Sequence, residues 1–428
     1  MNRDKVYITF MYLVSPLLGF LFSFSGKDRK LIKYGISLFS IWIGLSVSIA
    51  SGSNGDILRY QESYEFFQIN HYSVGWLLNQ VYAIDGYSDF FAVFTTYIFA
   101  NLGFRFEIYL GFLGLIFSVF YNKFIFQLID VSSKMTIDKK IIFLFALLVV
   151  PVWYGINNIR FTLVTMIFVT SIYDLALQKN RRKNILLICL TPLIHFTVFW
   201  VPIVIFVIFK LSNFLNTKIL LFSFVILALV PTNFIINSVN LSSYIPSLYE
   251  DRSNAYVDTE NISNRREQLS EVSKSLSFHA KFLPWSSNTV FYVLPIILGL
   301  TLIRKNRKIE EEDLILLKWI LLFGSITAVL SAFPSLGRFR AFVTLPAILL
   351  LFRHWDLVLK SFKHIVLILV FMMILYNIVK LRTALDSFSV TTIIGNPISL
   401  FFTDIESRTS LMDIPMMLTP VPVMLTPL

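Results

Sequence analysis

The sequence predicts an all-α, polytopic integral membrane protein in which residues 1–428 form a single membrane domain. Hydrophobic residues make up 56% of the chain, and its mean hydropathy of +0.71 implies more apolar surface than a soluble domain buries. Apolar runs of membrane-spanning length alternate with short basic turns, which is the second sign of a multi-pass protein. We therefore expect about 10–12 spans, with short or re-entrant helices among them and one large external loop.

The predicted spans follow one another from the N-terminus. The first apolar run, residues 6–24, is long for the apolar part of a signal peptide and lacks a small-x-small exit, so we expect a retained span. Spans are predicted near residues 6–25, 34–50, 106–128, 141–154, 158–177, 219–239, 289–304, 313–333, 341–353 and 364–379.

Basic residues gather in alternate connections, and this orients the chain in its membrane. The densest group, residues 179–183, directly follows an apolar run. Because cytoplasmic loops are enriched in Lys and Arg, the basic connections are predicted to be cytoplasmic and both termini external. These loops also account for the net charge of +11, which therefore indicates no nucleic-acid partner.

The stretch from residue 153 to residue 200 carries an ionisable residue on either side of the basic turn. Arg160 opens an apolar helix and His195 lies in the next apolar stretch, so both are expected at the external level. Residues 185–209 must leave the cytoplasm and return, yet they are too few for two full crossings. Two short helices meeting near His195, with Thr197 as a helix cap, satisfy this requirement, and one ordinary span is the alternative.

The connection formed by residues 51–105 is predicted to be an external loop with re-entrant helices. Asp56, Tyr60 and Tyr64 recur every four residues after a Gly-containing turn, so a helix places them on one face. The apolar pieces that follow are too short for full spans, and an interfacial or re-entrant helix suits their length. They lie near residues 74–84 and 88–101.

Arginines also occur at the predicted external end of the ninth span, where Arg338 and Arg340 precede it. External arginines oppose the positive-inside trend, and their planar guanidinium groups suit charge-assisted binding of phosphate. The large external loop, residues 240–288, is interpreted instead as a solvated connector. Arg160, Arg338 and Arg340 around one cavity would bind a diphosphate strongly in a medium of low dielectric constant.

A carboxylate and an imidazole complete the set of candidate residues. Asp56 and His195 suit the roles of general base and general acid. The sequence has no metal-protease, P-loop, nucleophilic-serine or paired-cysteine motif, and Cys189 is its single cysteine. We therefore expect no metal site and no cofactor.

These features together resemble the Wzy-type O-antigen polymerases and the related EpsG-type exopolysaccharide proteins. The resemblance rests on Gly55-Asp56 followed by Tyr60, on Arg160 before the basic turn, on His195-Phe196-Thr197, and on a late external arginine. The order of these motifs matches the family over most of the chain. Two departures concern the subfamily: Phe161 follows Arg160 where the family often has glutamine, and a threonine before Asp56 is missing.

The resemblance implies a metal-independent glycosyltransferase in the inner (cytoplasmic) membrane of a bacterium. Its donor would be a growing glycan on undecaprenyl diphosphate, transferred to the non-reducing end of a new lipid-linked repeat unit on the periplasmic face. Membrane lipids and a chain-length regulator are further partners that it suggests. Asp56 and His195 would be catalytic. Substrate contacts are expected from Arg160, Arg338, Arg340, Tyr60 and Arg59.

Three other functions remain as alternatives. A flippase for lipid-linked oligosaccharide predicts internal repeats and charges at mid-membrane depth, and neither is found in the sequence. A membrane O-acyltransferase requires a path for acyl-CoA from the cytoplasm, which an external His195 disfavours. An O-antigen ligase uses closely related chemistry, and the sequence does not separate it from a polymerase.

Overall fold

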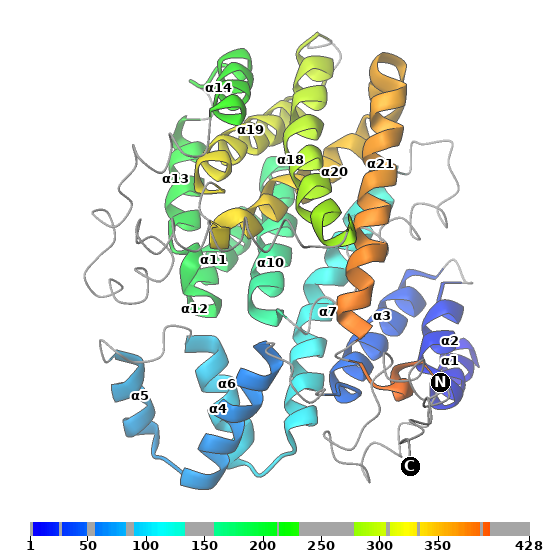
Figure 1. The fold of residues 1–428 in the computed structure, drawn as a ribbon, viewed down its shortest axis with the longest axis vertical. Helices are drawn as coiled ribbons and strands as arrows, with labels where there is room; N and C mark the ends of the chain where they lie inside the picture. Colours follow the sequence, from blue (N-terminus) through cyan, green and yellow to red (C-terminus); the bar gives the residue numbers. More distant parts are fainter. Residues whose placement is uncertain are drawn as a thin grey trace, which may run out of the picture.

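The computed structural model is a bundle of helices of unequal length (Figure 1). Within the described residues, β pairing is limited to an isolated bridge between Val47 and Phe388. In the part of the chain that the structure describes, five helices are long and apolar enough to cross a membrane: α7 (Phe106–Val131), α10 (Ile159–Ala176), α18 (Phe278–Arg304), α19 (Glu311–Leu330) and α21 (Trp355–Leu385). The predicted all-α, polytopic fold class is therefore confirmed. The structure describes residues 3–24, 28–48, 56–82, 90–132, 158–211, 214–230, 278–304, 309–331, 334–385 and 388–393.

The first predicted span is wrong, because it is two short helices, α1 (Arg3–Val14) and α2 (Pro16–Phe22). The Ser15 hydroxyl accepts a hydrogen bond from the Leu18 amide, and Pro16 stands at the first helical position, where its missing N–H costs nothing. The chain then folds back, and a Cβ added at Gly19 would lie 2.5 Å from the Tyr12 ring. An N-cap and a proline therefore end a run that hydropathy alone reads as continuous.

Helix α3 (Arg29–Leu45) packs along α7 through small residues. A Cβ added at Gly44 would lie 2.4 Å from the carbonyl oxygen of Leu110, and one added at Gly114 would lie 2.2 Å from that of Ser40. Such close approach of two backbones is typical of helix pairs in membranes. The pairing fixes α7, whose first turns support the helices around Arg160.

Three shorter helices lie at the end of the bundle where α10 begins, namely α4 (Asp56–Asn70), α5 (Val74–Tyr82) and α6 (Phe90–Asn101) (Figure 1). The two half-length apolar pieces predicted in this region are therefore confirmed as helices. Tyr60 and Tyr64 are buried on one face of α4, whereas Arg59 is exposed. The Tyr64 hydroxyl donates to the carbonyl oxygen of Phe104 over 2.7 Å and ties α4 to the start of α7.

The predicted helix break near His195 is present. Helices α11 (Arg181–Cys189) and α12 (Thr191–Ile194) lead to it, and η2 (Phe196–Val198), α13 (Trp200–Leu211) and α14 (Thr217–Leu229) follow. His195 itself has φ −149° and ψ 109°, an extended conformation that no helix accommodates. The alternative of one ordinary span is therefore wrong. The expected cap is wrong as well, because Thr197 lies inside η2, whose N-cap residue is His195.

The last part of the chain pairs long helices with a short arginine-bearing segment. Helix α19 leads into η6 (Pro334–Arg340), and α20 (Ala341–Arg353) continues directly from it. Helix α18 begins at Phe278, earlier than predicted. The prediction placed its start too late because a polar run interrupts the apolar pattern of this helix. Helix α21 is also longer than predicted and has a kink at Phe362, whose φ is −140°. Helices α18 and α21 lie side by side (Figure 1).

Several predicted features fall outside the described residues. They include the span near residues 141–154, the turn before Asp56, and the loop from 240 to 277. Residues 278–288 were predicted to be the last part of the external loop. They form the first turns of α18 instead, so the prediction of a loop is wrong for these residues.

Candidate functional site

Arg160 and Tyr60 are brought together from helices far apart in the sequence. Arg160 is the second residue of α10, and its Nε donates a hydrogen bond of 2.7 Å to the Tyr60 hydroxyl on α4. The guanidinium carbon also lies 5.1 Å from the centre of the Tyr60 ring. The hydrogen bond and the ring contact restrict the arginine to one direction, so α4 positions the side chain that α10 supplies.

His195 lies beside this pair, at the break between α12 and η2. Its side chain is buried, and its Nδ1 is 3.0 Å from the Thr197 hydroxyl oxygen. Burial, followed by the positive charges of Arg338 and Arg160, lowers the pKa of His195 below its usual value. The imidazole is therefore neutral at physiological pH, and its ring nitrogens offer one hydrogen-bond donor and one acceptor.

The Phe161 ring connects His195 to Arg338. The Arg338 guanidinium carbon lies 5.1 Å from the centre of this ring, and the His195 ring meets it edge-on with centroids 5.8 Å apart. Sequence reasoning noted Phe161 only as a departure from the family pattern. The structure gives the departure a physical meaning, since an aromatic face stabilises a cation where glutamine would offer an amide.

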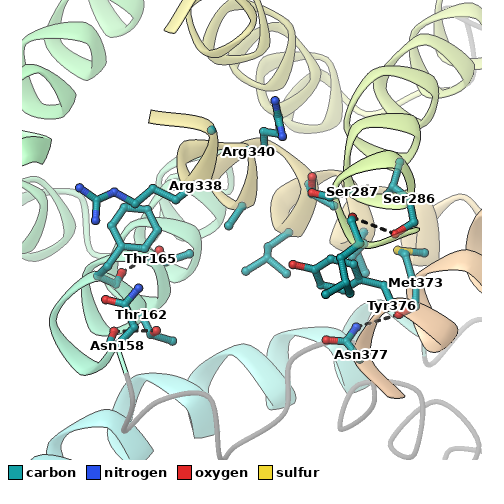
Figure 2. Close-up of a pocket in the computed structure, with 18 of the residues that line it drawn as sticks. Asn158, Thr162, Thr165, Ser286, Ser287, Arg338, Arg340, Met373, Tyr376 and Asn377 are labelled. Atoms are coloured by element: carbon teal, nitrogen blue, oxygen red, sulfur yellow. Dashed lines mark hydrogen bonds between the residues drawn. The ribbon is translucent and has the colours of Figure 1, made fainter. Parts of the chain in front are cut away.

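Arg340 points in another direction from Arg338, although only Phe339 separates them in η6. Figure 2 shows the two side chains diverging from this segment. The Arg340 guanidinium carbon lies 5.9 Å from the Phe291 ring centre, and a Cβ added at Gly337 would lie 3.5 Å from the same carbon. Both arginines line the space between α10 and α18, and their guanidinium groups diverge.

A cavity of about 470 Å³ occupies that space. Figure 2 shows Asn158, Thr162 and Arg338 on one side of it, and polar residues of α18 and α21 on the other. Among the described residues that line the cavity, Arg338 and Arg340 are cationic and none is acidic. The cavity therefore favours an anionic ligand, and its volume falls within the range of about 300–1,000 Å³ typical of ligand pockets.

The predicted site residues are thus placed in two groups. Arg160 is paired with Tyr60, and His195 and Arg338 both contact the Phe161 ring. Arg338 and Arg340 line the cavity. Arg59 is exposed on α4. Asp56 begins α4, and its side chain lies outside the described residues.

Sequence reasoning missed the polar residues on the far side of the cavity. Ser286 and Ser287 come from α18, and Tyr376 and Asn377 from α21. The available signal was the run Ser286-Ser287-Asn288-Thr289. Four consecutive polar residues are costly in an apolar membrane helix, so such a run indicates a polar cavity or a ligand. The sequence analysis instead assigns Ser286, Ser287 and Asn288 to the external loop of residues 240–288.

No group of three or more His, Cys, Asp or Glu side chains arranged to hold a metal ion is found in the part of the chain that the structure describes.

Comparison with known proteins identifies one family. The model of the EpsG family matches residues 31–392, which covers the cluster around Phe161, the cavity and most of the helices described above. No curated protein and no solved structure matches the chain.

Proposed function

Because this chain belongs to the EpsG family of polysaccharide polymerases, we propose that it joins repeat units carried on undecaprenyl diphosphate at the external face of a bacterial inner membrane. The product in this proposal is a surface polysaccharide such as the O-antigen of lipopolysaccharide. The donor is the growing glycan on its lipid diphosphate, and the acceptor is a single lipid-linked repeat unit.

One observation carries the proposal: a cavity between membrane helices with two arginines and no acidic side chain among the described lining residues. Burying a charged side chain among apolar helices costs free energy unless a group of opposite charge pairs with it. A diphosphate matches both the sign of the charge and the planar donors of guanidinium groups. It is also the part of the proposed substrate on which negative charge develops as the bond to the sugar breaks.

In the proposed reaction, the hydroxyl group at the acceptor's non-reducing end attacks the donor's anomeric carbon. A new glycosidic bond forms, the bond from that carbon to the diphosphate oxygen breaks, and the diphosphate leaves with the electron pair. Arg338 and Arg340 hold the diphosphate, and their charges stabilise it as it leaves. The hydroxyl proton passes to a base, for which Asp56 and His195 are the proposed groups.

The geometry supports separate roles for Arg160 and His195. The Tyr60 hydroxyl orients Arg160, which we assign to the outer part of the donor. The hydrogen bond between His195 Nδ1 and the Thr197 hydroxyl orients the imidazole, and in the tautomer protonated at Nδ1 its Nε2 accepts a substrate proton. No metal ion takes part in this proposal, because the leaving group is already activated and arginine charge serves in place of a cation.

The test is deletion of the gene in its source bacterium, followed by gel analysis of surface polysaccharide. A polymerase mutant retains one repeat unit and loses the ladder of longer chains, and wild-type protein restores the ladder. Complete loss of repeat units from the surface would instead indicate a flippase or a ligase and would overturn the proposal. The Arg338→Ala variant, produced at the wild-type level in the membrane, should behave like the deletion.

A further inference from the structure

The cavity has a second wall whose chemistry differs from that of the arginine wall. Ser287 comes from α18, and Tyr376 and Asn377 come from α21. Figure 2 shows these labelled side chains gathered across the cavity from Arg338. They offer hydroxyl and amide groups and carry no formal charge. We call Ser287, Tyr376 and Asn377 the neutral wall.

Hydrogen bonds within the helices leave hydrogen-bonding capacity on Asn377 and Ser287. The Asn377 side chain, with 6% of its surface exposed, donates from Nδ2 to the carbonyl oxygen of Met373 over 2.8 Å. That bond uses one of the four hydrogen bonds an Asn side chain can make. Ser287 is half-buried, and its hydroxyl has no hydrogen-bond partner among the described residues. Polar side chains inside membrane helices are costly unless they pair with each other or with a ligand.

Ser286, the neighbour of Ser287, provides a useful contrast. It is fully buried, and its hydroxyl donates back to the carbonyl oxygen of Leu283 over 3.1 Å, so it is satisfied within its own helix. The groups of the neutral wall with remaining hydrogen-bonding capacity are therefore the half-buried Ser287 hydroxyl and the Asn377 amide.

We propose that the neutral wall binds the hydroxyl groups of the sugar residue that is attached directly to the lipid diphosphate. This inference rests on the proposed function, because the arginines must hold the diphosphate for the sugar to lie opposite them. A sugar ring presents neutral donors and acceptors on several sides, which hydroxyl and amide groups match. The same cavity then recognises two parts of one ligand: charge on the side of η6 and hydroxyl pattern on the side of α18 and α21.

Substrate preference follows from this arrangement. A site built to hydrogen-bond a substrate hydroxyl rejects an analogue that lacks it, because the buried polar groups of the protein are then left unpaired. The neutral wall is thus a determinant of which first sugar the protein accepts, whereas the arginines accept any lipid diphosphate.

The test compares two ligands that differ only in the glycan. Full-length protein in nanodiscs is titrated with undecaprenyl diphosphate and, separately, with the undecaprenyl-diphosphate-linked repeat unit isolated from the source bacterium. Dissociation constants are measured for the wild type and for Asn377→Leu and Ser287→Ala. Thr289→Val is the matched control, because Thr289 lies on α18 outside the cavity lining and its hydroxyl bonds to its own helix.

We expect the wild type to bind the repeat unit more tightly than the bare diphosphate. Asn377→Leu and Ser287→Ala should each weaken binding of the repeat unit about three- to tenfold, as expected for loss of one neutral hydrogen bond. Their affinity for undecaprenyl diphosphate should match that of the wild type, and Thr289→Val should change neither. If Asn377→Leu does not fold, Ser287→Ala, which removes a single oxygen atom, still decides the question.

Two results would overturn the inference alone. One is equal loss of affinity for both ligands, which would mean that this wall contacts the lipid or shapes the cavity. The other is unchanged affinity for both ligands in every variant. Failure of the proposed function looks different, because wild-type protein would then bind neither ligand, or Arg338→Ala would bind undecaprenyl diphosphate as well as the wild type does.

Discussion

The two ends of α20 hold arginines in opposite ways. At its C-terminal end, the Arg353 Nε lies 2.8 Å from an Asp313 carboxylate oxygen, and the same guanidinium forms an ion pair with Glu310. At its N-terminal end, Arg338 and Arg340 lie against aromatic rings beside a cavity whose described lining has no acidic side chain. Protein carboxylates thus neutralise the charge at one end, and the charge at the other end favours an anionic ligand.

The comparison teaches that an arginine in a membrane helix says little until its neighbours are known. Asp313 is only 2% exposed and accepts from both Arg353 and His354, the latter over 2.8 Å. Arg353 also donates to the Tyr173 hydroxyl over 3.4 Å, which links α20 to α10. This end of α20 is therefore a structural ion-pair network that holds the helices together.

The largest effect that tests this comparison is expected from Asp313→Asn, and it should be on stability. Asp313→Asn removes the buried carboxylate that Arg353 and His354 share, and loss of one partner of a buried ion pair costs about 3–5 kcal/mol. We expect a lower melting temperature in detergent and less protein in the membrane, with normal turnover per folded molecule. Arg29→Gln is the control, since the Arg29–Asp130 pair is more than half exposed on both sides and such pairs contribute little. Equal melting of both variants and the wild type would contradict a stabilising network.

Arg338 should show the reverse behaviour, with normal stability and lost activity. Loss of its charge-assisted contact with the diphosphate should cost about 2–4 kcal/mol in the transition state, which is roughly a hundredfold or more in rate. Arg338→Lys should fail almost as badly as Arg338→Ala, because lysine lacks the planar fork. The loss of rate is measured as turnover of purified lipid-linked repeat units by the wild type and both variants at equal protein level. Near-normal turnover by the lysine variant would favour simple anchoring at lipid headgroups.

Phe161→Leu should have an intermediate effect on turnover. The substitution removes the aromatic face under Arg338, a contact of about 0.5–2 kcal/mol, so the rate should fall about three- to thirtyfold. Phe161→Tyr keeps the face and should stay close to the wild type. Phe168→Leu controls for lost packing, because Phe168 stacks on Phe342 in the same core. Equal losses in the two leucine variants would mean that Phe161 acts through packing alone.

The smallest effect is expected from Arg59→Gln. Arg59 is exposed on α4, and a contact it makes to a long glycan is weak and screened by water. Turnover should change by less than about twofold, against the large loss expected for Arg338. A tenfold loss would place the glycan along the exposed face of α4 and extend the site beyond the cavity.

Much of the architecture could be predicted from hydropathy and local signals. The helix break at His195 followed from charge parity, and the half-length helices α5 and α6 followed from the length of their apolar runs. The first span was mispredicted, because the effect of Ser15-Pro16 depends on local hydrogen bonding that hydropathy does not measure. The early start of α18 was missed, because its polar residues are explained by a cavity between helices and not by an aqueous loop.

The sequence by itself determined the fold class and the residue types of the site, since length, hydropathy and charge are properties of the chain. Which residues meet was decided only by the tertiary structure. Tyr60 reaches Arg160 across two helices, Phe161 lies between His195 and Arg338, and α21 brings Asn377 opposite the arginines. The physical reason is that helices pack through side-chain shape and close backbone approach, as at Gly44 and Gly114. Those contacts depend on pairs of residues distant in sequence, and a pattern read along one chain carries no information about such pairs.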